Sequence, residues 1–207
     1  MSRARFASMS IHEKRIFAQG FKKIAGIDEA GRGPLAGPVI AAACILPPQA
    51  YFKHLNDSKQ VSPAQRETLY EQLTRAKDVA FGIGQASVLE IEQINILQAT
   101  LLAMQRAVQA LPIVPDYLLI DGNRSPYFNI RKETLVKGDT LSVSIAAASI
   151  LAKVFRDRLM EEMGKKWPNY GFAKHKGYGT KEHIEAIQKW GPCPDHRMTF
   201  APVKKSS

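Results

Sequence analysis

Short apolar runs, each bounded by proline or polar residues, alternate along this chain with longer segments of helical periodicity. Such runs, about four to eight residues long, predict buried strands. The strands predicted in this way are Ile24–Ile27, Val39–Leu46, Val79–Ala86, Asp116–Ile120 and Thr134–Val136. The second lies between Pro38 and Pro47, and prolines are typical of strand ends.

Serine and threonine caps mark the starts of the predicted helices. Ser62 precedes Pro63, and Ser87 stands three residues before Glu90, so both serines are predicted N-caps. Caps and apolar spacing together predict helices over residues 62–76, 87–110, 140–164 and 180–190, with a further helix at 11–18. Strands that come first, followed by strands alternating with helices, favour a mixed sheet covered by helices.

The size and charge of the chain indicate how many domains it forms and what kind of partner it binds. Its 207 residues, 45% of them apolar, are enough for a single domain with a core of its own. We expect that domain to span residues 1–207, although residues 1 to about 20 carry no recognised motif. The formal net charge of +10 favours a polyanionic partner, nucleic acid first, but many soluble proteins are basic without one.

The cysteines and the apolar runs indicate the cellular compartment in which the protein is expected. Cys44 and Cys193 have neither the spacing of a zinc site nor that of a disulfide framework, which favours a reducing compartment. No apolar run approaches the roughly 18 residues of a membrane span, and the first ten residues lack a signal-peptide core. We therefore expect a cytoplasmic protein that has no membrane partner.

Acidic residues stand at the ends of three predicted elements, in Asp28-Glu29, Asp121-Gly122 and Gly138-Asp139. If the strands before Asp28 and Asp121 are neighbours, these carboxylates meet at one edge of the sheet. Such a cluster is electrostatically costly without a cation and suits a two-ion phosphoryl-transfer site holding Mg²⁺ or Mn²⁺. Asp121-Gly122 alone is also an ordinary turn, and Asp157 is expected to form only an ion pair on a helix surface.

A glycine-rich loop with the pattern Gly31-x-Gly33-x-x-x-Gly37 follows the first acidic pair. Glycines allow backbone N–H groups to approach a ligand closely. The loop is one residue longer than a dinucleotide fingerprint and contains Pro34, and no Walker lysine follows it. Acidic side chains that can bind a metal thus lie beside a backbone segment that can contact a substrate. This arrangement is expected of an enzyme that acts on phosphate esters.

Lysines and aromatic residues alternate between Lys165 and Lys181, a segment with no acid. Lys174 and Lys176 are candidate phosphate contacts, and Tyr178, between two glycines, is a candidate stacking residue for a sugar or base. The other aromatics of the segment, Trp167 and Phe172, are expected in the core.

Two further polar groups leave alternatives open. Ser58 and Lys59 lie in an Asn-Asp-Ser-Lys loop that could hold a phosphate but is equally an ordinary turn. His175 and His196 could contact phosphate or could be structural, since no pair of histidines has metal-ligand spacing.

Taken together, these motifs point to a known family. The segments that carry the resemblance are Asp28–Pro38, Asn56–Lys59, Ile120–Gly122, Lys137–Asp139, Ala146–Lys153 and Lys174–Thr180. In this order, and over about residues 24–203, the chain resembles bacterial ribonuclease HII.

The resemblance implies a ribonuclease H-like fold, in which helices flank a five-stranded mixed sheet and a small helical part lies at the C-terminus. It also implies an endonuclease that cleaves the RNA strand of RNA–DNA hybrids. A further implied activity is incision on the 5′ side of single ribonucleotides embedded in duplex DNA, leaving 3′-hydroxyl and 5′-phosphate ends. Both duplexes are the expected partners, and we expect the protein to act as a monomer.

The family's functional positions carry over onto this chain. The catalytic, metal-binding carboxylates, which hold Mn²⁺ or Mg²⁺, match Asp28, Glu29, Asp121 and Asp139. The loop that reads the ribose 2′-hydroxyl through its backbone matches Gly31, Arg32 and Gly33. Tyr178 matches the tyrosine that stacks on the next deoxyribose, and Ser58 and Lys59 match phosphate contacts.

Three other interpretations compete with this one. The related ribonuclease HIII lacks the Gly-Arg-Gly form of the loop and has an added N-terminal domain, so it does not fit. A junction resolvase or exonuclease of the same fold could use the same carboxylates, but the loop with Arg32 and the position of Tyr178 argue against it. A non-catalytic nucleic-acid-binding protein would gain nothing from acids that repel phosphates.

Overall fold

The computed structural model describes residues 3–205, and its centre is a five-stranded mixed sheet with the strand order β3-β2-β1-β4-β5. Strand β2 is antiparallel to both of its neighbours, whereas β1, β4 and β5 run parallel to one another. The strands are β1 (Ile24–Ala30), β2 (Val39–Ile45), β3 (Ala80–Ala86), β4 (Tyr117–Asp121) and β5 (Arg131–Leu135). The predicted mixed sheet is confirmed.

The helices begin where the capping serines and threonine predicted. Ser62 accepts a hydrogen bond from the Gln65 amide, Ser87 forms a full capping box with Glu90, and Thr180 caps the last helix. The helices are α1 (Arg3–Met9), α2 (Ile11–Ala18), α3 (Pro63–Arg75), α4 (Val88–Gln109), α5 (Val143–Lys166), α6 (Phe172–His175) and α7 (Lys181–Trp190). Among the described residues, no helix is long and apolar enough to cross a membrane.

The structure differs from the prediction at three places. An additional helix, α1, precedes the predicted α2. Strand β5 begins at Arg131 rather than at the predicted Thr134, because its pairing with β4 starts at Arg131 and Tyr117. Asn95 interrupts α4 with φ of 66° and ψ of 164°. Its side-chain oxygen accepts hydrogen bonds from the next turn, so it restarts the helix as a cap would.

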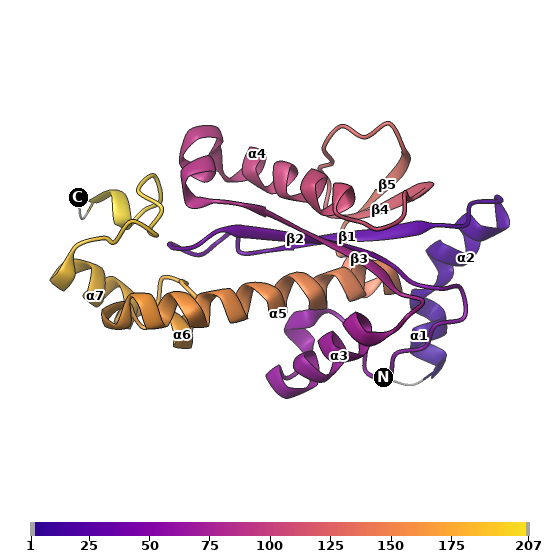
Figure 1. Cartoon of the computed structure of the whole chain (residues 1–207), viewed down its shortest axis with the longest axis horizontal. Helices are drawn as coiled ribbons and strands as arrows, with labels where there is room; N and C mark the ends of the chain where they lie inside the picture. The colour runs from indigo at the N-terminus through magenta and orange to yellow at the C-terminus, as the bar shows by residue number, and fades with distance from the viewer. Residues whose placement is uncertain (1–2, 206–207) are drawn as a thin grey trace.

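The sheet is covered on both faces (Figure 1). Helix α4 lies on one face, and α5 with α3 lies on the other. All seven residues of β2 are buried as a result, which explains the continuous apolar run between its two prolines. Helices α6 and α7 form the small helical C-terminal part beyond the end of α5.

Helix α5 touches β1 backbone to backbone. A Cβ atom added to Gly26 would lie 2.0 Å from the Ser144 carbonyl carbon and 2.2 Å from the Ile145 nitrogen. Only glycine fits at this crossing. The alanines that follow, Ala146–Ala148, are fully buried and keep the helix close to the sheet.

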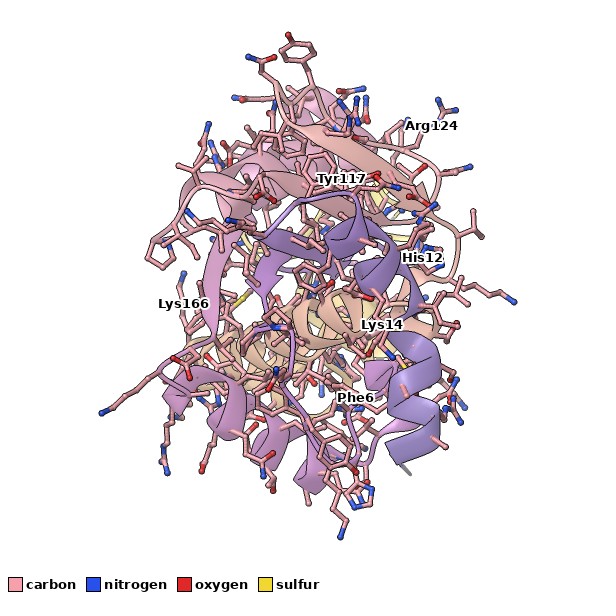
Figure 2. All side chains as sticks on the ribbon, turned by 90° about the vertical axis from the view of Figure 1, so that its right-hand side faces the viewer. Phe6, His12, Lys14, Tyr117, Arg124 and Lys166 are labelled. Carbon is pink, nitrogen blue, oxygen red and sulfur yellow. The ribbon has the colours of Figure 1, made fainter. Side chains whose placement is uncertain are left out.

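The N-terminal helices hold the start of α5. Figure 2 looks onto this end of the molecule, with Phe6 on α1 and His12 and Lys14 on α2. The buried Glu13 carboxylate accepts hydrogen bonds from the Ser142 hydroxyl at 2.5 Å and from the Ser144 hydroxyl at 2.7 Å. A carboxylate at a helix N-terminus also interacts favourably with the helix dipole. Residues 10–18 therefore fix the end of α5 that follows Asp139.

The crossing at Gly26 gives a stability prediction. Gly26→Ala should lower the free energy of unfolding by about 3 kcal/mol or more, because the new methyl group meets backbone that cannot yield. Urea denaturation measures the change. Gly33→Ala is the matched control, since its Cβ would find only the Tyr178 ring, at 3.8 Å. Equal stability of the two variants would contradict the tight crossing.

Candidate active site

The sheet brings two of the predicted acids together. Strands β1 and β4 are parallel neighbours, and their register pairs Ile27 with Ile120. Asp28 and Asp121, which come next, therefore lie side by side. Asp28 is not at the end of its strand as predicted, because β1 continues to Ala30 by pairing with β2.

Asp139 joins this pair from a 3₁₀ turn, Gly138–Thr140. The Gly138 amide donates a hydrogen bond of 2.6 Å to Asp121 Oδ1, which ties the turn to the end of β4. Lys137, just before it, adopts a left-handed conformation with φ of 58°. The third acidic element end thus lies beside the second, and all the predicted carboxylates occupy one region.

A further carboxylate, Asp57, reaches the same region and was not among the predicted site residues. It is buried, caps the turn at Ser58–Gln60, and is one of the groups that raise the pKa of Asp139. The polar loop Asn56–Lys59 could have pointed to Asp57, but the family resemblance assigned substrate contacts only to its serine and lysine.

Burial among like charges perturbs these acids. The pKa of Asp28 is raised well above its usual range, first by burial and then by Glu29 and Asp121. Burial also raises the pKa of Glu29. The Arg32 guanidinium, which pairs with Glu29 at 3.2 Å, opposes this rise. The pKa of Asp139 rises to about 6 through burial and the charges of Asp57 and Asp121, which Lys59 opposes.

These perturbed carboxylates fit a hard divalent cation. All the donors are oxygens, which Mg²⁺ and Mn²⁺ prefer, and a cation would offset the repulsion that raises the pKa values. Within residues 3–205, no three carboxylate, imidazole or thiol groups already converge on a single metal position.

A cavity of about 270 Å³ opens directly beside the carboxylates. It is lined by the predicted substrate residues Gly31, Arg32, Gly33, Ser58, Lys59 and Tyr178, together with Asp28 and Glu29. The Tyr178 ring is 45% exposed, as a stacking surface requires. The sequence had placed these residues far apart, and the fold gathers them around one opening.

Two residues of α5 also line this cavity and were not predicted. The Ser149 hydroxyl donates to the Ser58 hydroxyl at 3.0 Å. The Lys153 ammonium lies 6.0 Å from the centre of the Tyr178 ring and pairs with Asp157 at 2.7 Å. Asp157 therefore forms the helix-surface ion pair that was predicted, and its partner is the cavity lysine four residues earlier.

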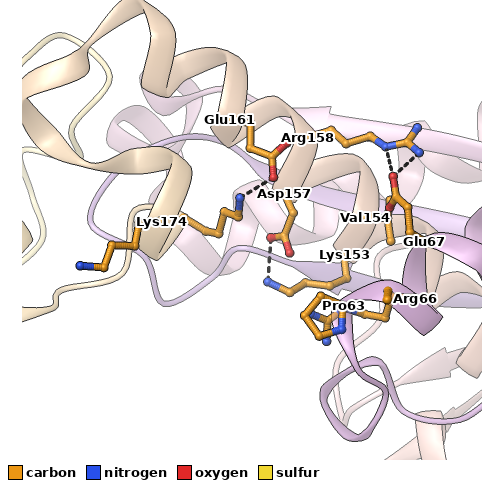
Figure 3. Close-up of a pocket in the computed structure, with 11 residues that line it drawn as sticks. Pro63, Arg66, Glu67, Lys153, Val154, Asp157, Arg158, Glu161 and Lys174 are labelled. Carbon is orange, nitrogen blue, oxygen red and sulfur yellow. Dashed lines mark hydrogen bonds and ion pairs between the residues drawn. The ribbon is translucent and has the colours of Figure 1, made fainter.

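Lys174 and Lys176 lie outside this cavity, in a neighbouring groove between α3 and α5 (Figure 3). The groove has a volume of about 530 Å³ and meets the cavity at Lys153. Lys174 pairs with Glu182 at 2.6 Å, and Lys176 pairs with Glu161 at 2.7 Å.

The histidines are structural rather than cavity residues. The Cys193 amide donates to His196 Nδ1, and His196 Nε2 lies 3.0 Å from His183 Nε2. His183 Nδ1 in turn lies 2.9 Å from the Tyr178 carbonyl oxygen. Neutral tautomers satisfy this whole chain of hydrogen bonds, in agreement with burial that lowers the pKa of His183 to about 4.

The aromatic residues of the segment divide as expected. Phe172 is fully buried against His183 and His196, so its predicted core position is confirmed. Trp167 packs at the edge of the same C-terminal core and donates a hydrogen bond of 2.6 Å to Asp195. His175 also belongs here, because its Nδ1 accepts from the Gly177 amide beside Tyr178.

Comparison with known proteins agrees with the resemblance. A family model described as Ribonuclease HII matches residues 25–203. The chain is 56% identical to Ribonuclease HII of Acetivibrio thermocellus over 95% of this chain and 76% of that protein. It is 52% identical to Ribonuclease HII of Chlamydia pneumoniae over 97% of this chain and 94% of that protein.

The fold is shared with a solved structure as well. The ribonuclease H2 from Pyrococcus horikoshii OT3 matches with a TM-score of 0.73 and 27% identity, over 89% of this chain and 96% of that one. The predicted ribonuclease H-like fold is therefore confirmed.

The charge repulsion in the site gives a prediction on stability and pH. The folded pKa of Asp139, about 6, exceeds the ordinary 3.8, so its ionisation penalises the fold increasingly as pH rises from about 4 to 6. Without divalent ions, Asp139→Asn should therefore raise the free energy of unfolding at pH 8 by on the order of 2 kcal/mol.

The gain from Asp139→Asn should vanish near pH 3.5, where the wild-type carboxyl is protonated in both states. Urea denaturation in EDTA at the two pH values measures it. Asp157→Asn, which breaks an ion pair on the same face of the molecule, should give no gain. A variant at position 139 that is less stable than wild type at pH 8 would contradict the repulsion.

Proposed function

The chain belongs to the ribonuclease HII family, whose members are endoribonucleases that act on the RNA strand of RNA–DNA hybrids, and we propose that it also incises duplex DNA on the 5′ side of a single embedded ribonucleotide. Cleavage would leave 3′-hydroxyl and 5′-phosphate ends. The glycine loop, Tyr178 and two of the acids, Asp28 and Glu29, line one cavity, and this observation carries the proposal.

The loop and the tyrosine can contact the same nucleotide step. The Cα atom of Gly33 faces the Tyr178 ring, where an added Cβ would lie 3.8 Å from Cε1. Backbone N–H groups of Arg32 and Gly33 can donate to a ribose 2′-hydroxyl, while the exposed ring stacks on the following deoxyribose. A substrate that meets both requirements has a ribonucleotide followed by a deoxyribonucleotide.

We infer that Asp28, Glu29, Asp121 and Asp139 hold the catalytic Mg²⁺ or Mn²⁺. When bound as a pair, these ions supply a nucleophilic water and stabilise the charge that develops on the leaving oxygen. The chain's own residues position the substrate. Ser58 and Lys59 face the cavity and can bind a phosphate, and the charges of the acids favour the protonated ammonium of Lys59, whose pKa is raised despite its partial burial.

We propose that the groove of Figure 3 carries the duplex away from the site. Lys153 stands where the groove meets the cavity, and Lys174 lines its far part. The Arg66 guanidinium donates to the Ser58 and Val61 carbonyls, so it adds positive charge directly behind the phosphate-binding loop. Backbone phosphates can replace Glu182 as the partner of the exposed Lys174 at little cost.

The competing functions fit the site less well. A resolvase or exonuclease of this fold has no need of a loop that reads a 2′-hydroxyl beside a stacking ring. A protein that only binds nucleic acid has no use for buried acids that raise one another's pKa values and repel phosphates.

We further propose a single catalytic domain that acts as a monomer in the cytoplasm. Cys44 and Cys193 are both free and buried, which supports a reducing compartment. Sedimentation at micromolar concentration tests the monomer, and a stable dimer there would contradict it.

Cleavage of defined duplexes tests the proposed function. A DNA duplex with one ribonucleotide should be cut once, on its 5′ side, with added Mg²⁺ or Mn²⁺, whereas the all-DNA duplex stays intact. Excess EDTA and Asp28→Asn should each abolish cleavage, because the charge of the transition state is then left uncompensated. Cleavage that survives EDTA, or cutting of the all-DNA duplex, would rule out the proposal.

Tyr178 gives a sharper prediction. Removing a stacking ring costs on the order of 1–3 kcal/mol, so Tyr178→Ala should slow incision of the embedded ribonucleotide by about 5- to 150-fold. Tyr178→Phe keeps the ring and should keep most of the rate. Single-turnover rates measure both, and calorimetry should show unchanged metal affinity. If both variants cut like wild type, Tyr178 is only a structural residue.

A further inference from the structure

The back of the glycine loop rests on a buried arginine. Arg197 has no exposed surface, and its guanidinium donates hydrogen bonds to the carbonyls of Gly31 at 2.6 Å, Arg32 at 2.9 Å and Gly37 at 2.8 and 2.9 Å. All these acceptors are backbone carbonyls of the loop. Burial, and then the neighbouring Arg156, lower the pKa of Arg197 to about 9, which leaves it charged at neutral pH.

These contacts fix the orientation of two peptide groups. The only cis peptide bond among the described residues is Ala201–Pro202, so the peptides that follow Gly31 and Arg32 are trans. In a planar trans peptide the N–H points opposite to the C=O. Because Arg197 holds the carbonyls of Gly31 and Arg32 on the buried side, the N–H groups of Arg32 and Gly33 face the other way.

That other side is the substrate cavity, which both residues line. Within residues 3–205, neither the Arg32 nor the Gly33 amide donates to another backbone or side-chain group. Both donors are therefore available to a ligand.

We propose that Arg197 is a positioning residue for ribose recognition: its guanidinium holds the Gly31 and Arg32 carbonyls so that the Arg32 and Gly33 amides point at the substrate 2′-hydroxyl. The inference rests on the proposed function and adds a residue that lies about 165 positions away from the loop in sequence. Arg197 touches no substrate and acts only through the peptides it holds.

A second buried arginine provides a matched control. Arg156 on α5 donates to the carbonyls of Ala36, Pro38 and Lys176, at 3.0–3.2 Å. It supports the same loop and packs against Gly31, but it donates to neither the Gly31 nor the Arg32 carbonyl. Lysine at either position keeps the charge but cannot reproduce the planar, several-point contact of a guanidinium.

Binding measurements separate positioning from general support. In an Asp28→Asn background, which prevents turnover, the dissociation constant is measured in Mg²⁺ for a duplex with one ribonucleotide and for its all-DNA counterpart. The preference for the ribonucleotide should be about tenfold or more, as expected of two hydrogen bonds. Arg197→Lys should reduce that ratio to near one with little change in affinity for the all-DNA duplex.

Arg156→Lys should keep the preference within about twofold of its parent, even if it lowers the melting temperature as much as Arg197→Lys does. A preference that survives Arg197→Lys, or that is lost equally in both variants, overturns the positioning role. If the parent itself shows no preference for the ribonucleotide, the proposed function fails, and that result is distinct from a failure of Arg197.

A measurement on the wild-type chain decides the matter if Arg197→Lys does not fold. In amide proton–nitrogen spectra recorded in EDTA, the Arg32 and Gly33 signals should shift on addition of the ribonucleotide duplex and stay nearly unchanged with the all-DNA duplex. Identical responses to the two duplexes would overturn the proposal.

Discussion

The backbone contact between α5 and β1 at Gly26 is the constraint on which the site depends. It fixes the helix against the strand that carries Asp28 and Glu29, with no side chain to act as a spacer. Four residues of α5 then follow one face of the helix at intervals of three or four positions: Ser149, Lys153, Arg156 and Met160. Ser149 and Lys153 line the cavity, Arg156 holds the loop, and Met160 packs under Gly37 and Gly177. One helix face therefore supports the whole opening.

Buried charge is handled in opposite ways on the two sides of this opening. Arg156 and Arg197 are buried, but their guanidinium groups are satisfied by backbone carbonyls, so they stabilise the loop. The carboxylates are buried beside one another, and burial and mutual repulsion raise the pKa values of Asp28 and Asp139. The fold thus leaves negative charge uncompensated where we propose that cations bind, and satisfies positive charge where it supports the loop.

The sequence predicted the features of this arrangement that depend on local patterns, such as caps and apolar runs. The capping residues Ser62 and Ser87 predicted helix starts, and the apolar runs predicted strands β1 to β4, whereas most of the polar edge strand β5 was missed. The proximity of Asp28 and Asp121 followed only on the condition that their strands were neighbours, which no local pattern decides. The burial of Arg156 and Arg197 could not be predicted from the sequence, because arginine is almost always exposed. Nothing in Arg156-Asp157-Arg158 marks the first arginine as buried. The resemblance implied what the glycine loop reads, but not what holds it.

The C-terminal part of the chain holds the glycine loop through backbone hydrogen bonds. The Gly37 amide donates to the Asp195 carbonyl, the Leu35 amide to the Gly177 carbonyl, and the Arg197 amide to the Leu35 carbonyl. The same part holds Tyr178 from behind through the neutral pair His183 and His196. The sheet thus brings Asp28 and Asp121 together, whereas the glycine loop is held by hydrogen bonds with the C-terminal part of the chain. Because Arg197 and Tyr178 belong to the same C-terminal part, the proposed donors to the 2′-hydroxyl and the proposed stacking ring are held relative to each other, as recognition of two adjacent sugars would require.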